Sequence, residues 1–246
     1  LYHQAIAGRI FARTGFYQNS GACGFRDQLQ DCCAVILQTP QIAKRQIYRA
    51  CAAQFLEGDV LHWWHKLPNK IMRGVRTRYS DDLLWLPYTV CEYLEKTNDK
   101  SILSKNIAYC DGPLLQEHQH ENYINVQSSG IYESVYNHCK RAIGHAISLI
   151  GEHGLLLMGG GDWNDGYNGV GINGKGESVW LTQFTIILLE RFSNICSMIG
   201  EQSDCQSYKD LANEFKEAIE NSCWDGEWYL RAFFDDGKTL GSHLNE

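Results

Sequence analysis

The sequence predicts an all-α fold in which helices are joined by connections that are alternately short and long. Two observations favour it: apolar residues recur at helical spacing in six segments, and the one clearly alternating segment lies near the C-terminus. At 246 residues, with 44% hydrophobic content, the chain is long enough to bury a substantial core. We therefore expect a single domain over residues 1–246.

Three helices are predicted in the first half of the chain, over about residues 24–38, 41–55 and 80–97. Thr39 and Pro40 break the pattern between the first two, because proline lacks the backbone donor that a helix interior needs. Ser80, followed by two aspartates, is a good N-cap for the third helix, and Pro87 should kink that helix or delay its start. The polar residues 98–130 are expected to form a solvated cover, with a short helix over 102–109.

Three more helices are predicted in the second half, over about residues 131–150, 178–199 and 207–223. The stretch Val179–Ile199 is apolar on most sides, so we expect a deeply buried helix and, if its face is uncovered, association into a homodimer. The last helix keeps a single apolar stripe, as an outer helix does. After it, Asp-Gly pairs in an alternating stretch predict a small C-terminal β-hairpin.

The glycine-rich stretch at 155–180 is the predicted active-site loop. Its eight glycines permit a tight turn that presents Asp162, Trp163, Asn164 and Asp165. Tryptophan offers a flat apolar face for a sugar ring, and an aspartate shielded from water beside it would have the raised pKa that a general acid needs. From these residues alone, a plain turn cluster with a core tryptophan is an equally good interpretation.

The order of the helices predicts where the functional segments meet. If consecutive helices are antiparallel neighbours, every second connection lies at the same end of the bundle. That end would collect the residues before the first helix, those after Cys223, and the segments 57–79 and 155–177. These segments are rich in Trp, His, Arg, Asp and Gly, so we expect the binding site there.

Charge and cysteine usage exclude several classes of function. The net charge of -7 and the pI near 5.7 argue against nucleic acid or an anionic membrane as a partner. We find no signal segment and no apolar run long enough to span a bilayer. The ten cysteines lack a disulfide spacing, which favours a reducing cytoplasm, and neither Cys nor His spacing predicts a metal site.

Six motifs resemble glycoside hydrolase family 94: GFRDQLQD at 24–31, EGDVLHWWH at 57–65, RGVRTRYSDDLLWLPY at 73–88, GGDWNDGYN at 160–168, GKGESVWL at 174–181 and WDGEWYLRAFFDDG at 224–237. Within that family they are most similar to the phosphorylase-like C-terminal region of the cyclic β-1,2-glucan synthases. The cellobiose phosphorylases match less closely. The motifs are long, keep their order and cover nearly the whole chain.

The resemblance implies an (α/α)6 barrel that catalyses inverting phosphorolysis of β-linked gluco-oligosaccharides, in particular β-1,2-glucan. The product would be α-glucose 1-phosphate. In the synthase this would control chain length. By position, Asp165 matches the general acid, and Arg26, Asp27 and Trp163 match residues that hold the sugar before the cleaved bond. The resemblance implies inorganic phosphate as the co-substrate and no cofactor. A single essential carboxylate is enough, because an anionic nucleophile needs positioning rather than activation by a second carboxylate.

Other polar residues are assigned to the substrate site with less support. Asp162 and Asn164 belong to the same turn, and we expect Asp162 to act as its structural brace. Glu177 could orient the loop by hydrogen bonding. His62 and His65 either line the sugar cleft with two neighbouring tryptophans or belong to a packed aromatic loop.

Structural interpretations of the motif residues stay open. Arg26 and Asp27 could form only a charge pair at a helix start. Asp81 and Asp82 could only cap a helix. The arginines of the third motif could be solvated: Arg73, Arg76 and Arg78.

The resemblance also has gaps. Six helices are half of a twelve-helix barrel, and the family's phosphate-binding residues are expected beyond Glu246. Some family phosphorylases have a sugar-binding arginine near the position of Ser20, where this chain has none. We therefore expect a weakly active or inactive fragment whose partner is the remainder of a larger synthase at the bacterial inner membrane. The alternatives are a non-catalytic glucan-binding or regulatory segment, and a hydrolase that uses Asp162 as its second carboxylate.

Overall fold

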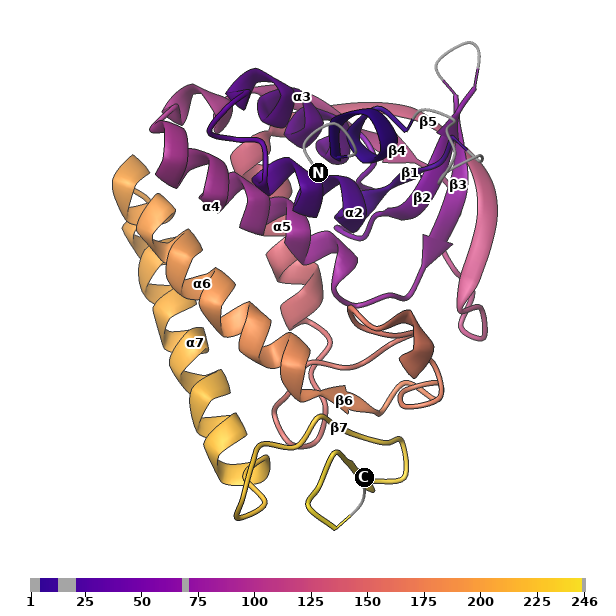
Figure 1. Cartoon of the computed structure of the whole chain (residues 1–246), viewed down its shortest axis with the longest axis vertical. Coiled ribbons are helices and arrows are strands. Elements are labelled where there is room, and N and C mark those ends of the chain that lie inside the picture. Colours follow the sequence, from indigo (N-terminus) through magenta and orange to yellow (C-terminus); the bar gives the residue numbers. More distant parts are fainter. Residues whose placement is uncertain (1–4, 13–20, 68–70, 245–246) are drawn as a thin grey trace. The chain divides into compact units, whose positions relative to one another are not determined.

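A computed structural model describes residues 5–12, 21–67 and 71–244, so the position of Ser20 lies outside the described residues. The chain divides into two compact units (Figure 1). Unit 1 comprises Leu1–Thr77 and Asp82–His145, and unit 2 comprises Arg78–Asp81 and Ala146–Glu246. A single domain over the whole chain stays a prediction.

The helices of unit 1 are shorter than predicted. A π-helical turn, η1, spans Ala5–Ile10, and the α-helices are α2 (Phe25–Cys33), α3 (Pro40–Cys51), α4 (Trp85–Thr97) and α5 (Val135–Ile147). The first helix ends at Cys33 because a turn closes before Pro40, where the amide of Thr39 donates to the carbonyl of Val35 (2.8 Å). The first-turn position of Pro87 confirms the delayed start of α4, which follows the 3-10 helix η3 (Asp82–Leu84).

A five-stranded antiparallel sheet makes the all-α prediction wrong for unit 1. Its order is β1-β2-β3-β5-β4, with β1 (Cys23–Gly24), β2 (Leu61–Lys66), β3 (Met72–Thr77), β4 (Asn106–Asp111) and β5 (Glu121–Ser134). The segment 98–130, predicted as a solvated cover, is mostly exposed or half-buried, and it also contributes β4 and most of β5 to this sheet. Only a 3-10 turn, η4 (Lys100–Ile102), lies near the predicted helix at 102–109. Few of the β5 residues are buried, so the segment lacks a strong apolar alternation.

Buried Arg76 shows that not all arginines of this region are solvated. It is 1% exposed and donates to both carboxylate oxygens of Asp59 (2.6 Å each) and to Glu57 (3.0 Å). Its guanidinium also lies 3.8 Å from the ring centroid of Phe55. This network ties β3 to the segment that leads into β2.

A second charge network predicts acid sensitivity. The carboxylate of Glu133 accepts two hydrogen bonds from Arg141 (2.6 and 3.0 Å) and one from the Tyr109 hydroxyl (2.8 Å). The bonds from Arg141, above all, lower the pKa of Glu133 to about 2. Because the folded-state pKa is depressed, the stabilisation is complete above pH 4.5 and is lost as the pH falls toward 2. It amounts to about 2 kcal/mol, allowing for solvent screening of this partly exposed pair.

The corresponding experiment is urea unfolding between pH 7 and pH 2.5, comparing the unaltered chain with Glu133→Gln. The variant should be less stable at neutral pH and should approach the unaltered chain as the pH falls. Glu121→Gln, an exposed glutamate of the same strand, serves as the matched control. Parallel pH profiles for Glu133→Gln and the unaltered chain would contradict this assignment.

Unit 2 is built on two long antiparallel helices that lie side by side (Figure 1). They are α6 (Val179–Ile199) and α7 (Gln202–Ser222), joined at Gly200, which has φ 90°. Most of α6 is buried, as predicted, although Ile187 is 52% exposed. Association into a homodimer stays a prediction. The second helix begins five residues before the predicted start at 207, and its Glu201 N-cap makes no side-chain capping bond.

The predicted C-terminal hairpin is confirmed. Strands β7 (Ala232–Phe233) and β8 (Thr239–Leu240) pair antiparallel across the Asp-Gly turn at 236–237, and β6 (Glu177–Ser178) adds a third strand. The pairing of β6 with β7 brings the end of the glycine-rich loop beside the C-terminal segment. Two of the segments predicted to share one end therefore lie together within unit 2.

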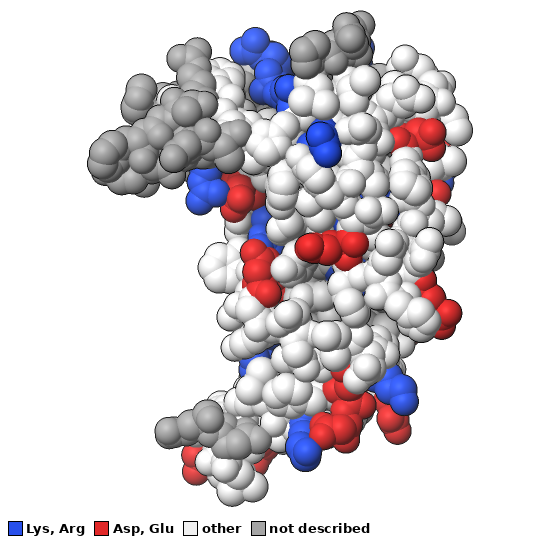
Figure 2. All heavy atoms as spheres, turned by 90° about the vertical axis from the view of Figure 1, so that its right-hand side faces the viewer, with Lys and Arg blue, Asp and Glu red and all other residues white. Residues whose placement is uncertain are grey.

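The cysteine side chains lie mostly in the protein interior. All ten cysteines are free, and nine are buried. Burial raises the pKa of the Cys51 thiol above its ordinary value. In the described part of the chain, no helix is long and apolar enough to cross a membrane, and no three His, Cys, Asp or Glu side chains are grouped to hold a metal ion. Among the coloured residues of Figure 2, acidic and basic side chains are scattered without a continuous basic surface.

Candidate active site

The glycine-rich loop of unit 2 is fixed at its entry by Glu177 of β6. This side chain is 2% exposed, and its Oε1 accepts from the amides of His153 (3.0 Å) and Leu155 (3.2 Å). The imidazole of His153 contacts Oε2 and stacks on Phe233 at 3.9 Å between ring centroids. Glu177 therefore orients the loop by hydrogen bonding.

Residues 78–81 hold the middle of the loop. The amide of Gly160 donates to the carbonyl of Arg78 (2.9 Å), and the amide of Ser80 donates to the carbonyl of Gly161 (2.9 Å). The hydroxyl of Ser80 donates to the carbonyl of Met158 (2.9 Å). The predicted role of Ser80 as the N-cap of the helix that follows is wrong, because α4 begins at Trp85 and its N-cap is Leu84.

Asp235 holds the end of the loop. Its carboxylate accepts from three loop amides, those of Asn173 (2.8 Å), Lys175 (2.8 Å) and Gly176 (2.9 Å). Three separate segments thus fix the loop, so the turn between them is presented by a rigid frame. Asp235 lies in the last of the sequence motifs, but its acceptor role could not be predicted because its partners lie about sixty residues away.

Gly159 offers a test of this frame. Its φ of +60° is disfavoured for other residues, and a Cβ there would overlap the carbonyl oxygen of Arg78. Gly159→Ala should therefore lower the free energy of unfolding by about 2 kcal/mol. Gly169→Ala is the matched control within the loop, because a Cβ there meets no atom within 4 Å. Equal melting temperatures of the two variants in thermal unfolding would show that the close approach of Gly159 to residue 78 is not needed for stability.

Asp162 is a buried brace beneath the turn. It is 0% exposed, and its Oδ1 accepts from the amide of Asn164 (3.0 Å). Its Oδ2 accepts from the Ser178 hydroxyl (2.5 Å), and Arg231 donates to both oxygens (2.7 and 2.6 Å). The same hydroxyl accepts from the amide of Leu181 at the start of α6 (3.0 Å). The brace therefore connects the turn, the long helix and the C-terminal segment.

Arg231 was not predicted as a site residue. It lies just before β7, and its guanidinium is 4.7 Å from the ring centroid of Tyr167 as well as paired with Asp162. The signal that could have identified it is its place in the motif at 224–237, where it is an arginine within an apolar run.

The turn itself presents Trp163 and Asp165 to solvent. Asn164 accepts from the amide of Gly166 (2.9 Å) and thereby caps the 3-10 helix η5 (Asp165–Tyr167). Trp163 is 53% exposed, so the interpretation as a core tryptophan is wrong. Asp165 is also exposed, whereas partial shielding was expected. A sugar bound against the tryptophan face would supply that shielding.

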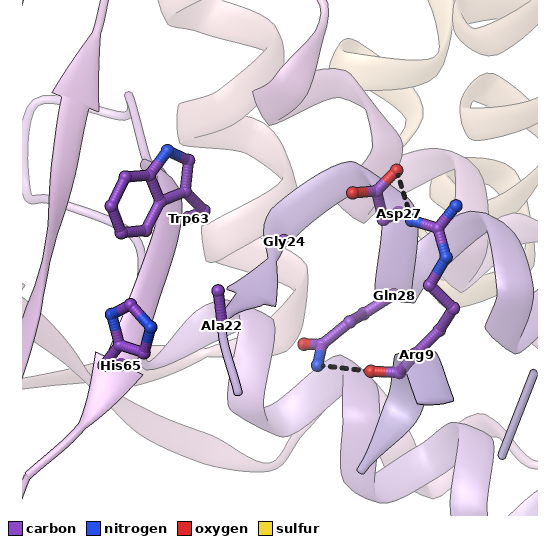
Figure 3. Close-up of a pocket in the computed structure, with 7 residues that line it drawn as sticks. All are labelled: Arg9, Ala22, Gly24, Asp27, Gln28, Trp63 and His65. Carbon is purple, nitrogen blue, oxygen red and sulfur yellow. Dashed lines mark hydrogen bonds and ion pairs between the residues drawn. The ribbon is translucent and has the colours of Figure 1, made fainter. Parts of the chain in front are cut away.

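Unit 1 contains a cavity of about 350 Å³ beside the start of α2. Figure 3 shows its lining residues: Arg9, Ala22, Gly24, Asp27, Gln28, Trp63 and His65. Asp27 forms an ion pair with Arg9 (3.0 Å), and the side-chain amide of Gln28 donates to the carbonyl of Arg9 (2.9 Å). Two predicted site residues, Asp27 and His65, therefore line one cavity.

Arg26 and His62 meet at a buried carboxylate in the same unit. Asp82 is 1% exposed, and its Oδ2 lies 2.7 Å from Nδ1 of His62. Its Oδ1 lies 3.9 Å from Nη1 of Arg26, which is 8% exposed. The carboxylate of Asp82 thus hydrogen-bonds His62 and lies within ion-pair distance of Arg26, so its interpretation as only a helix cap is wrong. Sequence reasoning missed this role because the histidine lies twenty residues away.

The family model for the catalytic domain of the glycosyl hydrolase 94 superfamily matches residues 1–246. The chain is 42% identical over 245 residues to the cyclic beta-(1,2)-glucan synthase NdvB of Rhizobium meliloti (strain 1021), covering 100% of the chain and 8% of that protein. It is 34% identical over 224 residues to the solabiose phosphorylase of Paenibacillus borealis, covering 91% and 26%. Identity to the N,N'-diacetylchitobiose phosphorylase of Vibrio proteolyticus is 27% over 243 residues, covering 89% and 28%.

Proposed function

The chain belongs to the glycosyl hydrolase 94 superfamily, and we propose from this that it supplies the general acid for inverting phosphorolysis of β-linked gluco-oligosaccharides. Asp165 protonates the leaving glycosidic oxygen while inorganic phosphate attacks the anomeric carbon from the opposite side, which yields α-glucose 1-phosphate. The observation that supports this role is the anchored turn that exposes both Trp163 and Asp165. Tryptophan there would receive the apolar face of the sugar.

The buried state of Asp162 favours phosphorolysis over hydrolysis. An inverting hydrolase needs a second carboxylate that faces water and activates it. Asp162 is 0% exposed and is occupied by Arg231 and Ser178, so it cannot reach a water molecule at the sugar. Phosphate is already an anionic nucleophile and needs no such base.

We propose β-1,2-glucan as the substrate because the synthase relative carries that linkage in its name. Arg26, Asp27 and Trp163 would hold the sugar before the cleaved bond. The chain spans 8% of that synthase and 26% of the solabiose phosphorylase. We also propose that the chain controls glucan chain length and that other parts of a longer polypeptide supply the phosphate site. Its proposed location is the cytoplasmic side of the bacterial inner membrane.

A non-catalytic glucan-binding segment is the second candidate. The unit 1 cavity supports it, because Trp63, His65 and Asp27 offer ring faces and polar groups for sugar binding without the acid of unit 2. A regulatory segment would bind glucan and leave it intact.

The deciding experiment measures phosphate-dependent release of glucose 1-phosphate from β-1,2-gluco-oligosaccharides, using this chain and a form extended past Glu246. We expect release by the extended form and little or none by the chain alone. Glucose released without phosphate would indicate a hydrolase. Binding without any release by the extended form would indicate the regulatory segment.

A further inference from the structure

One face of the unit 1 sheet carries a row of rings next to the cavity. The strand register sets Trp63 opposite Val75, and Val75 opposite Tyr123, across β2, β3 and β5. His65 and Arg73 pair in the neighbouring row. Because side chains two residues apart on a strand point to the same face, all of these residues share one face of the sheet.

Three of these side chains form what we call the aromatic platform: Trp63, His65 and Tyr123. The Trp63 ring centroid lies 5.5 Å from that of Tyr123, with the planes tilted by 42°, and 5.6 Å from that of His65, edge-on. The Arg73 guanidinium lies 4.8 Å from the Tyr123 centroid. The rings are thus held against one another on the strands rather than on a loose loop.

The platform is distinct from the hydrophobic core. On the opposite face of β2, Trp64 is 2% exposed and packs edge-on against Phe25 at 6.5 Å. Tyr123, in contrast, is 47% exposed. Trp63 and His65 are half-buried beside it, and a cluster of rings that stays partly exposed is a candidate binding surface.

The platform continues into the cavity that contains Asp27. Trp63 and His65 belong to both, and Figure 3 shows their rings one above the other along β2, with Ala22 beside them. The cavity adds the carboxylate of Asp27, which can accept hydrogen bonds from sugar hydroxyls. Apolar faces flanked by a few polar groups suit carbohydrate, whereas the net charge of -7 disfavours a polyanion.

We propose that the aromatic platform binds additional glucose units of a β-linked gluco-oligosaccharide whose end occupies the cavity at Asp27. This inference rests on the proposed substrate class and adds selection for chain length. A disaccharide would fill the cavity without reaching Tyr123, the outermost ring. A longer oligosaccharide would stack one of its sugar rings there and bind more tightly.

The test is isothermal titration calorimetry of the full chain with a β-1,2-linked disaccharide and with longer β-1,2-gluco-oligosaccharides. Tyr123→Ala should weaken binding of the longer ligands by about tenfold and leave the disaccharide affinity unchanged, since only one stacking contact is removed. Tyr123→Phe keeps the ring and should bind as the unaltered chain does. Tyr132→Ala, at a 63% exposed tyrosine of the same strand, should have no effect.

Three results would overturn the platform: affinity that does not grow with ligand length, equal affinities of Tyr123→Ala and Tyr132→Ala for the longer ligands, or no binding of either ligand by the full chain. The proposed reaction has a separate readout. Glucose 1-phosphate release by the extended form would persist if only the platform were wrong. Length-dependent binding that depends on Tyr123 would persist if only the reaction were wrong.

Discussion

Asp165→Asn is expected to reduce glucose 1-phosphate release by the extended form by about 10²–10⁴-fold, the usual contribution of a general acid. Asparagine keeps the shape of the side chain but cannot donate a proton to the leaving oxygen. The capping bond of the turn, from the amide of Gly166 to the side chain of Asn164, is kept in this variant. The measurement is the initial rate of phosphate-dependent release.

Two controls separate loss of the acid from loss of the fold. Asp236→Asn alters another exposed carboxylate of unit 2 and should keep the full rate. β-Glucosyl fluoride, whose leaving group departs without protonation, should restore most of the rate of Asp165→Asn with phosphate. A variant with the unaltered rate on oligosaccharides would remove Asp165 from the mechanism. If Asp165→Asn were slowed as much on β-glucosyl fluoride as on oligosaccharides, the cause would be a structural defect instead.

Features that depend on local sequence were predictable. The helix Val179–Ile199 and the C-terminal hairpin were found because each is specified by its own periodicity and turn residues. The large sheet of unit 1 was missed because β5 pairs with β3 over a separation of about fifty residues and buries few of its own side chains. Strand formation there depends on tertiary context that local propensity does not contain.

The candidate site also contains residues that local sequence predicts and residues that depend on remote partners. The turn at 162–165 could be predicted, since glycines, Asx residues and tryptophan occur together in the sequence. The residues that position it, Arg231 and Asp235, could not be assigned because their partners are remote. The same holds for Asp82, whose carboxylate meets His62 in the folded chain only.

Asp162→Ala is expected to lower the free energy of unfolding by about 3 kcal/mol, the lower part of the range for removing one partner of a buried ion pair. It leaves Arg231 without its carboxylate and removes the acceptor of the Ser178 hydroxyl. Urea unfolding at neutral pH measures the change. Asp236→Ala, which removes an exposed carboxylate paired with Lys238, should change stability by less than about 0.5 kcal/mol.

A double-mutant cycle with Arg231→Ala distinguishes a brace from a catalytic group. If the pair acts as a unit, the double variant should lose less stability than the sum of the single losses, because the second substitution removes a charge that the first left unpaired. Additive losses, or stability of Asp162→Ala equal to that of Asp236→Ala, would contradict the brace. In the extended form, Asp162→Ala should then slow the reactions of oligosaccharide and β-glucosyl fluoride equally, since misplacing the turn also displaces the exposed ring of Trp163, which we propose to contact the sugar in both substrates. A loss confined to oligosaccharides would instead mean that Asp162 takes part in protonating the leaving oxygen.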